Sequence, residues 1–409
     1  MIKLPKEIRD IIGSLKEKGI SSYAAGPCVA DSIMGKEPLD WDMTAGCSLS
    51  EMKDIFTQGK ELGEVLRLDF TGEKEDGLIV DIFPYEEEPG EFLQRQEFTV
   101  YAMADNPEMG FLDPYEGRED IRKKLIRTVG DPVKLFNSDP PAMMRAIIIA
   151  AENGFDIHKE TYEAMLECAP LLEDAPVDEI RENFCTIIIS PYAGKGLRML
   201  AGADLMPAII GDIATKLSRR QLEQFSCICN NVHKTKRNLK RRLGLFYAAL
   251  EGKKGEEAMR RLNYDPETEQ NILDGLYLME KIHFFRSTVD LKDALVAYGP
   301  ERYEYIDNLA KAQRIVYGTS DAKILMRNAL MDDIISKKEP IYVEDLAVDE
   351  EKLIQAGIPA ERAGEILVML TDIVHRKPSD NNEKELVKNA KKFARSKFAA
   401  RTRKVKWLR

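Results

Sequence analysis

Cysteine and histidine are scarce in this chain, and neither kind of residue is grouped. Its 409 residues include only six cysteines and four histidines. The cysteines are Cys28, Cys47, Cys168, Cys185, Cys227 and Cys229, and the histidines are His158, His233, His283 and His375. No Cys-x-x-Cys spacing occurs, so the sequence predicts no zinc site, no redox motif and no disulfide framework. A reducing compartment, the cytoplasm, is therefore the expected location.

Long apolar runs and a net positive charge are also absent. No apolar run approaches the length that spans a bilayer, and the N-terminus lacks a signal-peptide pattern. The net charge of −10 argues against attraction of the whole surface to nucleic acid. With 44% hydrophobic and 32% charged residues, the chain has the composition of a globular protein of two or more domains.

The positive charge of the chain is concentrated in two stretches. Residues 386–409 contain ten cations and no acid, with Phe393, Phe398 and Trp407 among them, and a second basic cluster spans residues 234–242. Cations interleaved with aromatic rings suit contact with nucleic-acid phosphates, although a solvated basic face is the alternative. The candidate contacts are Lys388, Lys391, Lys392, Arg395, Lys397, Arg401, Arg403, Lys404, Lys236, Arg237, Lys240 and Arg241.

The hydrophobic pattern changes along the chain. Residues 1–18 have the period of an amphipathic helix, and short apolar runs then alternate with turn signals as far as residue 130. The expected strands include residues 66–70, 78–83 and 125–129. From residue 139 onward the helical period dominates, beginning with a helix over 142–153 that ends at Gly154. The pattern predicts an α+β protein, with a small α/β head followed by helices.

Asp40 and Asp42 form the first candidate site. They follow the Gly26-Pro27 turn, and we expect strand, turn, short helix and then a second strand that carries both aspartates. Side chains two positions apart on a strand point to the same face, so the two carboxylates should converge. Converging carboxylates at a strand end can hold Mg²⁺ against substrate phosphates. The alternative is a solvated aspartate pair in a loop or at a helix cap.

These motifs together resemble the bacterial tRNA nucleotidyltransferase family, the CCA-adding enzymes and related poly(A) polymerases. Gly26-Pro27-Cys28-Val29-Ala30-Asp31, then Gly35 and Asp40-Trp41-Asp42, is similar to the family's Gly-Gly-x-Val-Arg-Asp and Gly-x-x-x-x-Asp-x-Asp. Residues 95–102 resemble its Arg-Arg-Asp-Phe-Thr-x-Asn-Ala motif, and 138–148 resemble its template-reading Glu-Asp-x-x-Arg-x-x-Arg-x-x-Arg motif. Residues 111–121, 126–132 and 357–367 match further family motifs in order.

The resemblance implies a fold and an activity. It implies a nucleotidyltransferase head over 1–135, a helical neck with the template-reading motif over 136–195, a helical body over 196–320 and a helical tail with a basic end over 321–409, in an elongated arrangement. The implied reaction adds CMP, AMP or both from CTP and ATP to the 3′ end of a tRNA or other structured RNA, with Mg²⁺ as cofactor and release of pyrophosphate. It implies no membrane and no protein partner.

The resemblance also assigns roles to residues. Asp40 and Asp42 would be catalytic and would bind Mg²⁺. Asp81, the acid within an apolar strand, would be a third metal ligand, although a solvated strand face explains it equally well. The nucleotide-binding positions would be Gly26, Asp31, Arg95, Asp139 and Arg145.

Several positions depart from the family pattern. Pro27 replaces a glycine, Tyr101 replaces an asparagine, and the expected arginines are missing at Ala30, Gln96, Ala142 and Ile148. Because a hydrogen bond to a charged group contributes about 1.5–3 kcal/mol, we expect weak triphosphate affinity, and restoring Ala30→Arg and Ala142→Arg together should tighten it. The alternative functions are a non-catalytic RNA-binding protein that keeps the fold and an enzyme that transfers a nucleotide to a protein or small molecule.

Overall fold

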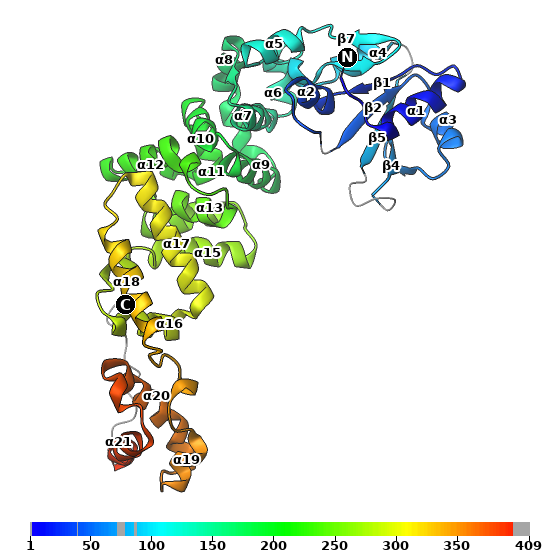
Figure 1. The fold of residues 1–409 in the computed structure, drawn as a ribbon. Coiled ribbons are helices and arrows are strands. Elements are labelled where there is room, and N and C mark those ends of the chain that lie inside the picture. The colour runs from blue at the N-terminus through cyan, green and yellow to red at the C-terminus, as the bar shows by residue number, and fades with distance from the viewer. Residues whose placement is uncertain (1, 39, 72–77, 86–87, 396–409) are drawn as a thin grey trace. The chain divides into compact units, whose positions relative to one another are not determined.

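The computed structural model describes residues 2–38, 40–71, 78–85 and 88–395 (Figure 1). The chain divides into two compact units. The first comprises Met1–Lys216 with Arg261–Asn263, and the second comprises Leu217–Arg260 with Tyr264–Arg409. None of the described helices has the length and apolar character that crossing a membrane requires. The division into head, neck, body and tail stays a prediction.

A mixed seven-stranded sheet lies in the first unit, with the strand order β3-β4-β5-β2-β1-β6-β7. The strands are β1 (Ser22–Ala25), β2 (Trp41–Ala45), β3 (Lys60–Leu62), β4 (Val65–Asp69), β5 (Ile79–Pro84), β6 (Ala104–Asn106) and β7 (Gly110–Leu112). β2 and β5 are parallel, and the other neighbouring pairs are antiparallel. The sheet confirms the strands expected over 66–70 and 78–83 to within a residue or two.

One face of the sheet is packed with apolar side chains. Leu66, Leu68, Val80, Ile82 and Met43 are buried in one core with side chains of α1 (Lys6–Glu17), α2 (Pro27–Ile33) and α3 (Leu49–Ile55) (Figure 1). Side chains alternate across a strand, so the residues between these core positions point to the other face. The second face therefore carries the polar residues of β2, β4 and β5.

The rest of the first unit is mostly helical. Its elements are α4 (Pro89–Gln94), α5 (Gly117–Lys123), β8 (Leu125–Ile126), α6 (Pro132–Ser138), α7 (Ala142–Asn153), β9 (Asp156–Ile157), α8 (Lys159–Cys168), α9 (Val177–Ile189), α10 (Ala193–Gly202) and α11 (Met206–Ile210). α7 has the predicted bounds, and Gly154 ends it with a φ of 72°. The strand expected over 125–129 is only the two residues of β8, because its partner β9 is equally short.

The second unit is helical throughout its described residues. Its helices are α12 (Arg219–Asn231), α13 (Leu239–Ala248), α14 (Gly252–Arg261), α15 (Pro266–Tyr277), α16 (Thr288–Tyr298), α17 (Pro300–Tyr317), α18 (Ala322–Ser336), α19 (Glu350–Gln355), α20 (Ala360–Arg376) and α21 (Glu383–Arg395). Helices α19, α20 and α21 share an apolar core that includes Leu353, Leu370 and Leu386. A sheet-bearing head followed by helices confirms the predicted α+β class.

Candidate active site

The turn at Gly26 brings the end of β1 against Asp42. Gly26 has a φ of 81°, and a Cβ built there would lie 3.7 Å from Asp42 Oδ2. A glycine adopts this left-handed conformation without strain. Its N–H is already used, because it donates to the carbonyl oxygen of Met103 at 3.0 Å. Pro27 follows without an N–H, so two backbone positions of this turn have no free amide for a phosphate.

Asp40 lies just before β2, which corrects our expectation that one strand carries both aspartates. β2 begins at Trp41, whose partner on β5 is Val80. On the other side β1 ends at Ala25 and the chain turns at Gly26, so Asp40 has no partner on β1. Asp40 is exposed and Asp42 is partly buried. The sequence spacing predicted that the two carboxylates lie near each other, but it wrongly placed Asp40 within the strand.

Asp42, Asp81 and Arg67 form a row across three adjacent strands on the open face of the sheet. Asp42 pairs in register with Asp81, and Asp81 pairs in register with Arg67. Arg67 donates from Nε and Nη2 to the two carboxylate oxygens of Asp81, at 2.8 and 2.7 Å. Both oxygens of Asp81 are therefore already hydrogen-bonded to a cation.

The electrostatics of this row fit a site for a cation. Burial, together with the negative charges of Asp81 and Asp40, raises the pKa of Asp42 to about 6, and the charge of Arg67 opposes this rise. A divalent cation between Asp40 and Asp42 would relieve this repulsion, and carboxylate oxygens are the ligands that Mg²⁺ prefers. Among the described residues, no group of three or more His, Cys, Asp or Glu side chains is arranged to hold a metal ion. The role of Asp81 as a third metal ligand stays a prediction.

Asp31 lies on α2, beside Lys36 and near Tyr101. The Lys36 Nζ is 3.8 Å from Asp31 Oδ1 and also donates to the Asn153 side-chain oxygen. Burial raises the pKa of Asp31. Burial also raises the pKa of the Tyr101 hydroxyl, with the charges of Glu152 and Asp31 adding to the effect. The tyrosine that replaces the family's asparagine is thus enclosed among acids.

Arg145 is held by three carboxylates. It donates from Nη2 to Glu97 at 2.6 Å and from Nη1 to Glu179 at 2.7 Å, and Nη2 also contacts Asp139. Its Nε donates to Glu97 at 3.0 Å. The structure therefore brings Asp139 and Arg145 together, as their common motif implies, but all three nitrogens of Arg145 already have acidic partners.

Asp139 lines a cavity of about 380 Å³ in which the charged residues are acids. These are Asp139, Asp174 and Glu179, accompanied by three prolines and Ser138. Carboxylates can only accept hydrogen bonds when ionised. This cavity therefore suits a ligand that donates, such as an exocyclic amino group, rather than a phosphate.

Two of the positions that lack the expected arginine are closed by packing. Ala30 on α2 and Ala142 on α7 are both fully buried. A longer side chain at either position would have to displace the atoms that cover the alanine. The expectation that restoring both arginines tightens nucleotide binding stays a prediction, and the burial of both alanines argues against it.

We expect Ala30→Arg or Ala142→Arg to destabilise the first unit by about 3 kcal/mol, through overpacking and burial of an unpartnered charge. Urea denaturation of each variant measures this loss. Gln96→Arg is the matched control, since Gln96 is only partly buried and occupies another position that lacks the arginine. Equal stability of Ala142→Arg and Gln96→Arg would contradict the packing argument.

Arg95 lies in a different cavity from the aspartates. It is exposed at the end of α4 and lines a cavity of about 760 Å³ with Ser48, Phe83, Tyr85 and Phe92. The residues lining this cavity include none of Gly26, Asp40 and Asp42. A nucleotide-binding role for Arg95 stays a prediction that no contact with the aspartates supports.

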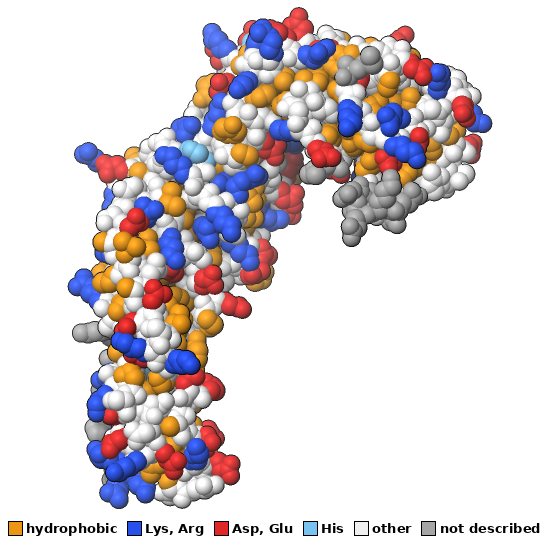
Figure 2. Space-filling model, in the orientation of Figure 1, with side chains coloured by type: hydrophobic (Ala, Val, Ile, Leu, Met, Phe, Trp, Pro, Cys, Tyr) orange, Lys and Arg blue, Asp and Glu red, His pale blue; other side chains and the backbone are white. Residues whose placement is uncertain are grey.

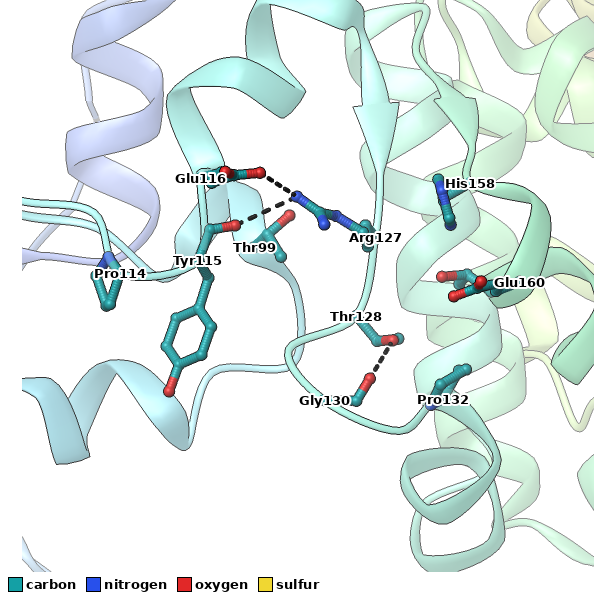
Figure 3. A pocket seen from close by; sticks show the side chains of 11 residues that line it. Thr99, Pro114, Tyr115, Glu116, Arg127, Thr128, Gly130, Pro132, His158 and Glu160 are labelled. Carbon is teal, nitrogen blue, oxygen red and sulfur yellow. Dashed lines mark hydrogen bonds and ion pairs between the residues drawn. The ribbon is translucent and has the colours of Figure 1, made fainter.

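A further cavity of about 390 Å³ is lined by Arg127, His158 and Glu160 among others, and it contains none of the predicted site residues (Figure 3). Arg127 points toward Glu116 and the carbonyl of Tyr115, to which it donates at 3.4 Å (Figure 3). It also donates to the buried Asp120 at 2.9 Å. This arginine is thus part of an internal network rather than of the aspartate row.

The described residues among the predicted RNA contacts are exposed or partly buried, as phosphate contacts should be. Lys388, Lys391, Lys392 and Arg395 are exposed on α21, and Figure 2 shows Lys and Arg side chains gathered over that end of the second unit. Of the second cluster, Lys236 and Arg237 are exposed, Arg241 is partly buried, and Lys240 forms an ion pair with Glu267. Lys397, Arg401, Arg403 and Lys404 lie outside the described residues.

Sequence reasoning missed three residues of this region: Arg67, Glu97 and Glu179. Arg67 alternates with leucines in the Leu66-Arg67-Leu68 strand, and that alternation was a signal that it shares the open face with Asp81. Glu97 stands at the position of the family's aspartate in the 95–102 motif. Glu179, on α9, had no signal, because only the packing of α9 against α7 brings it to Arg145.

Comparisons with known proteins agree with the motifs. Residues 154–217 match a family model described as the probable RNA- and SrmB-binding site of polymerase A. The CCA-adding enzyme of Streptococcus gordonii is 30% identical over 243 residues, which are 54% of this chain and 59% of that protein. The CCA-adding enzyme of Geobacillus stearothermophilus is 29% identical over 224 residues, covering 50% of this chain and 55% of that protein. The matches thus span less than two thirds of these curated relatives.

Solved structures share the fold over nearly the whole chain. The CCA-adding enzyme of Bacillus stearothermophilus in complex with CTP aligns with a TM-score of 0.75 and 23% identity, covering 95% of this chain and 97% of that one. The Thermotoga maritima CCA-adding enzyme complexed with tRNA aligns with a TM-score of 0.67 and 18% identity, covering 95% and 96%. The chain is thus similar in sequence to CCA-adding enzymes over about half of its length, and it shares their fold over nearly all of it.

Proposed function

We propose that this protein is a Mg²⁺-dependent nucleotidyltransferase that adds CMP, AMP or both to the 3′ end of a tRNA and releases pyrophosphate. The observation that carries the proposal is the pair Asp40 and Asp42 beside the Gly26 turn, where the pKa of Asp42 is raised by burial and by neighbouring carboxylates. The family's CTP- and tRNA-bound relatives support the same class of substrates.

In the proposed reaction the head has two tasks, which are to neutralise the charge of the triphosphate and to activate the attacking hydroxyl. The RNA 3′ oxygen attacks the α-phosphorus of the nucleotide, the new P–O bond forms, and the bond to the pyrophosphate oxygen breaks. Bound Mg²⁺ would supply charge neutralisation of the triphosphate and activation of the attacking hydroxyl. Asp40 and Asp42 would hold it, and Asp42, whose pKa is raised to about 6, is ionised at pH 8. The side chain absent at Gly26 leaves the space beside Asp42 open.

The helical part would bind the RNA. The match of residues 154–217 to an RNA-binding family model and the exposed cations of α21 support this role. Phosphate contacts give affinity that depends strongly on salt but little on sequence. The overall negative charge makes such a concentrated basic surface necessary for binding a polyanion.

A second candidate function is RNA binding without catalysis. Two observations favour it: Arg145 is fully engaged by Glu97, Asp139 and Glu179, and the Gly26 amide is used by Met103. Both reduce the number of donors available to a nucleotide. The two candidate functions use the same RNA-binding surface. They differ only in whether the site at Asp40 and Asp42 transfers a nucleotide to the RNA.

One assay separates the candidates. Purified protein is incubated with a tRNA that lacks its 3′-terminal nucleotides, Mg²⁺ and labelled CTP or ATP, and the RNA is resolved at single-nucleotide resolution. We expect extension by one or more nucleotides that stops when Mg²⁺ is chelated. Tight RNA binding with no extension and no Mg²⁺-dependent nucleotide binding would establish the non-catalytic candidate instead.

A further inference from the structure

We propose that Arg67 contacts the triphosphate of the incoming nucleotide, and that Asp81 positions Arg67 instead of binding metal. This inference rests on the proposed function, because it assumes that a metal-bound nucleotide lies over Asp40 and Asp42. Arg67 would supply positive charge for the triphosphate in a chain that lacks several of the arginines expected from the family. The ligand chemistry is a nucleoside triphosphate with its divalent cation.

The first argument is the placement of Arg67. Arg67, Asp81 and Asp42 are register partners on neighbouring strands, so all three side chains rise from the same face at one level. Neighbouring strands lie about 4.8 Å apart, which puts the backbones of Arg67 and Asp42 about 10 Å apart with Asp81 between them. Asp40 and Asp42 would hold the Mg²⁺ that neutralises the triphosphate, and the long side chain of Arg67 rises from the same face two strands away from Asp42.

The second argument is how the guanidinium is held. Nε and Nη2 bond to the two oxygens of Asp81, which fixes the plane of the group, while nothing among the described residues bonds to Nη1. The Arg67 side chain is 41% exposed, against 21% for Asp81. An arginine fixed on one side and free on the other is preorganised for a second anion, and guanidinium matches the geometry of phosphate.

The third argument is the charge balance of the row. Asp40, Asp42 and Asp81 bring three negative charges, and both Asp40 and Asp42 interact electrostatically with Arg67. Arg67 is the positive charge that lies in register with Asp42 and Asp81. Arg145 cannot serve, since its three nitrogens are held by Glu97, Asp139 and Glu179. Arg67 is the cation that the row itself provides.

The test uses Arg67→Gln and Asp81→Asn in the full chain. Arg122→Gln is the matched control, because Arg122 makes the same two-pronged contact with Glu119 on the head, at 2.7 and 2.6 Å, but far along the chain from the row. Affinity for Mg²⁺ with ATP or CTP is measured by calorimetry, and affinity for Mn²⁺ alone by electron paramagnetic resonance. Circular dichroism and thermal unfolding verify that each variant is folded, and Arg67→Lys supplies a variant that keeps the charge.

We expect Arg67→Gln to weaken nucleotide binding about 30-fold, the scale of a lost charge-assisted contact, with Mn²⁺ affinity unchanged or higher and the control unaffected. Arg67→Lys should recover part of the loss. Asp81→Asn should weaken nucleotide binding less, and should add nothing in an Arg67→Gln background, because it acts through the arginine.

Four outcomes would overturn the inference. Tighter nucleotide binding in Arg67→Gln would mean that Arg67 only blocks Asp81. Reduced Mn²⁺ affinity in Asp81→Asn without nucleotide would make Asp81 a metal ligand. If the wild type binds nucleotide and Arg67→Gln binds it equally well, the role of Arg67 is rejected and the proposed function stands. If the wild type binds no nucleotide with Mg²⁺, both the role of Arg67 and the proposed function are rejected.

Discussion

Asp42→Asn should abolish nucleotide incorporation and, at the same time, make the protein more stable at neutral pH. We expect incorporation to fall at least about 1,000-fold, because the amide removes one of two carboxylates that would hold the metal and position the triphosphate. Labelled CTP and ATP incorporation into a shortened tRNA measures the loss. Asp40→Asn should cause a similar loss.

The gain in stability follows from the raised pKa of Asp42. Its pKa is about 6 in the folded protein and 3.8 in the unfolded chain, so the folded state binds the proton more tightly. The aspartate therefore costs nothing below about pH 4, and the cost grows as pH rises to 6, to as much as about 3 kcal/mol above it. Asparagine removes that cost, so the variant and wild type should unfold alike at pH 4 and diverge at pH 7.

Urea denaturation at several pH values, with and without Mg²⁺, measures this difference. Mg²⁺ should stabilise the wild type and leave Asp42→Asn unchanged, since a ligand that binds only the folded state raises its stability. Asp10→Asn, an exposed change on α1, is the control for removing a carboxylate elsewhere. Undiminished incorporation by Asp42→Asn would place the chemistry outside the row.

Neutralising the basic face of α21 should weaken RNA binding most strongly among changes outside the head. Lys391, Lys392 and Arg395 are exposed, whereas Leu386 and Ala390 of the same helix are buried in the core of α19–α21. Substitution by glutamine therefore removes charge and keeps the packing, which truncation within α21 would destroy. We expect the triple variant to bind tRNA about 10- to 100-fold more weakly at low salt.

The salt dependence of binding tells whether these cations touch phosphates. The slope of log affinity against log salt should fall by about 2 in the triple variant, since each phosphate contact contributes about 0.7–0.9. Glu383→Gln with Glu385→Gln is the matched control on the same helix and should not weaken binding. An unchanged slope in the triple variant would mean that α21 is a solvated surface, and the cluster of Lys236, Arg237, Lys240 and Arg241 would become the preferred contact.

Much of the head was predictable because its signals are local. The alternation of apolar residues gave β4 and β5, and the Gly26 turn lies beside Asp42, as the motif that contains both implies. The helix over 142–153 was predictable to the residue, since Gly154 supplies the left-handed conformation that ends it.

What escaped prediction depends on contacts between distant segments. Asp81 alternates regularly within its strand, but only the register with β4 shows that Arg67 occupies both its oxygens. Likewise, the motif containing Arg145 gave no hint that Glu97 and Glu179, from two other parts of the chain, would surround it. A motif gives the identity of a residue, whereas its availability depends on the neighbours that the fold supplies.

The parallel pairing of β2 with β5 has a consequence for how the head folds. Parallel strands cannot close through a tight hairpin, so this pair must wait for a long loop to close, whereas β3–β4 and β4–β5 are antiparallel neighbours in the chain. We therefore expect the pairing of Asp42 with Asp81 to form late in folding. Trp41, buried next to Asp42 and paired with Val80, changes environment in that same step. Its fluorescence during refolding should report the moment at which the site is assembled, and adding Mg²⁺ should slow unfolding more than it speeds folding.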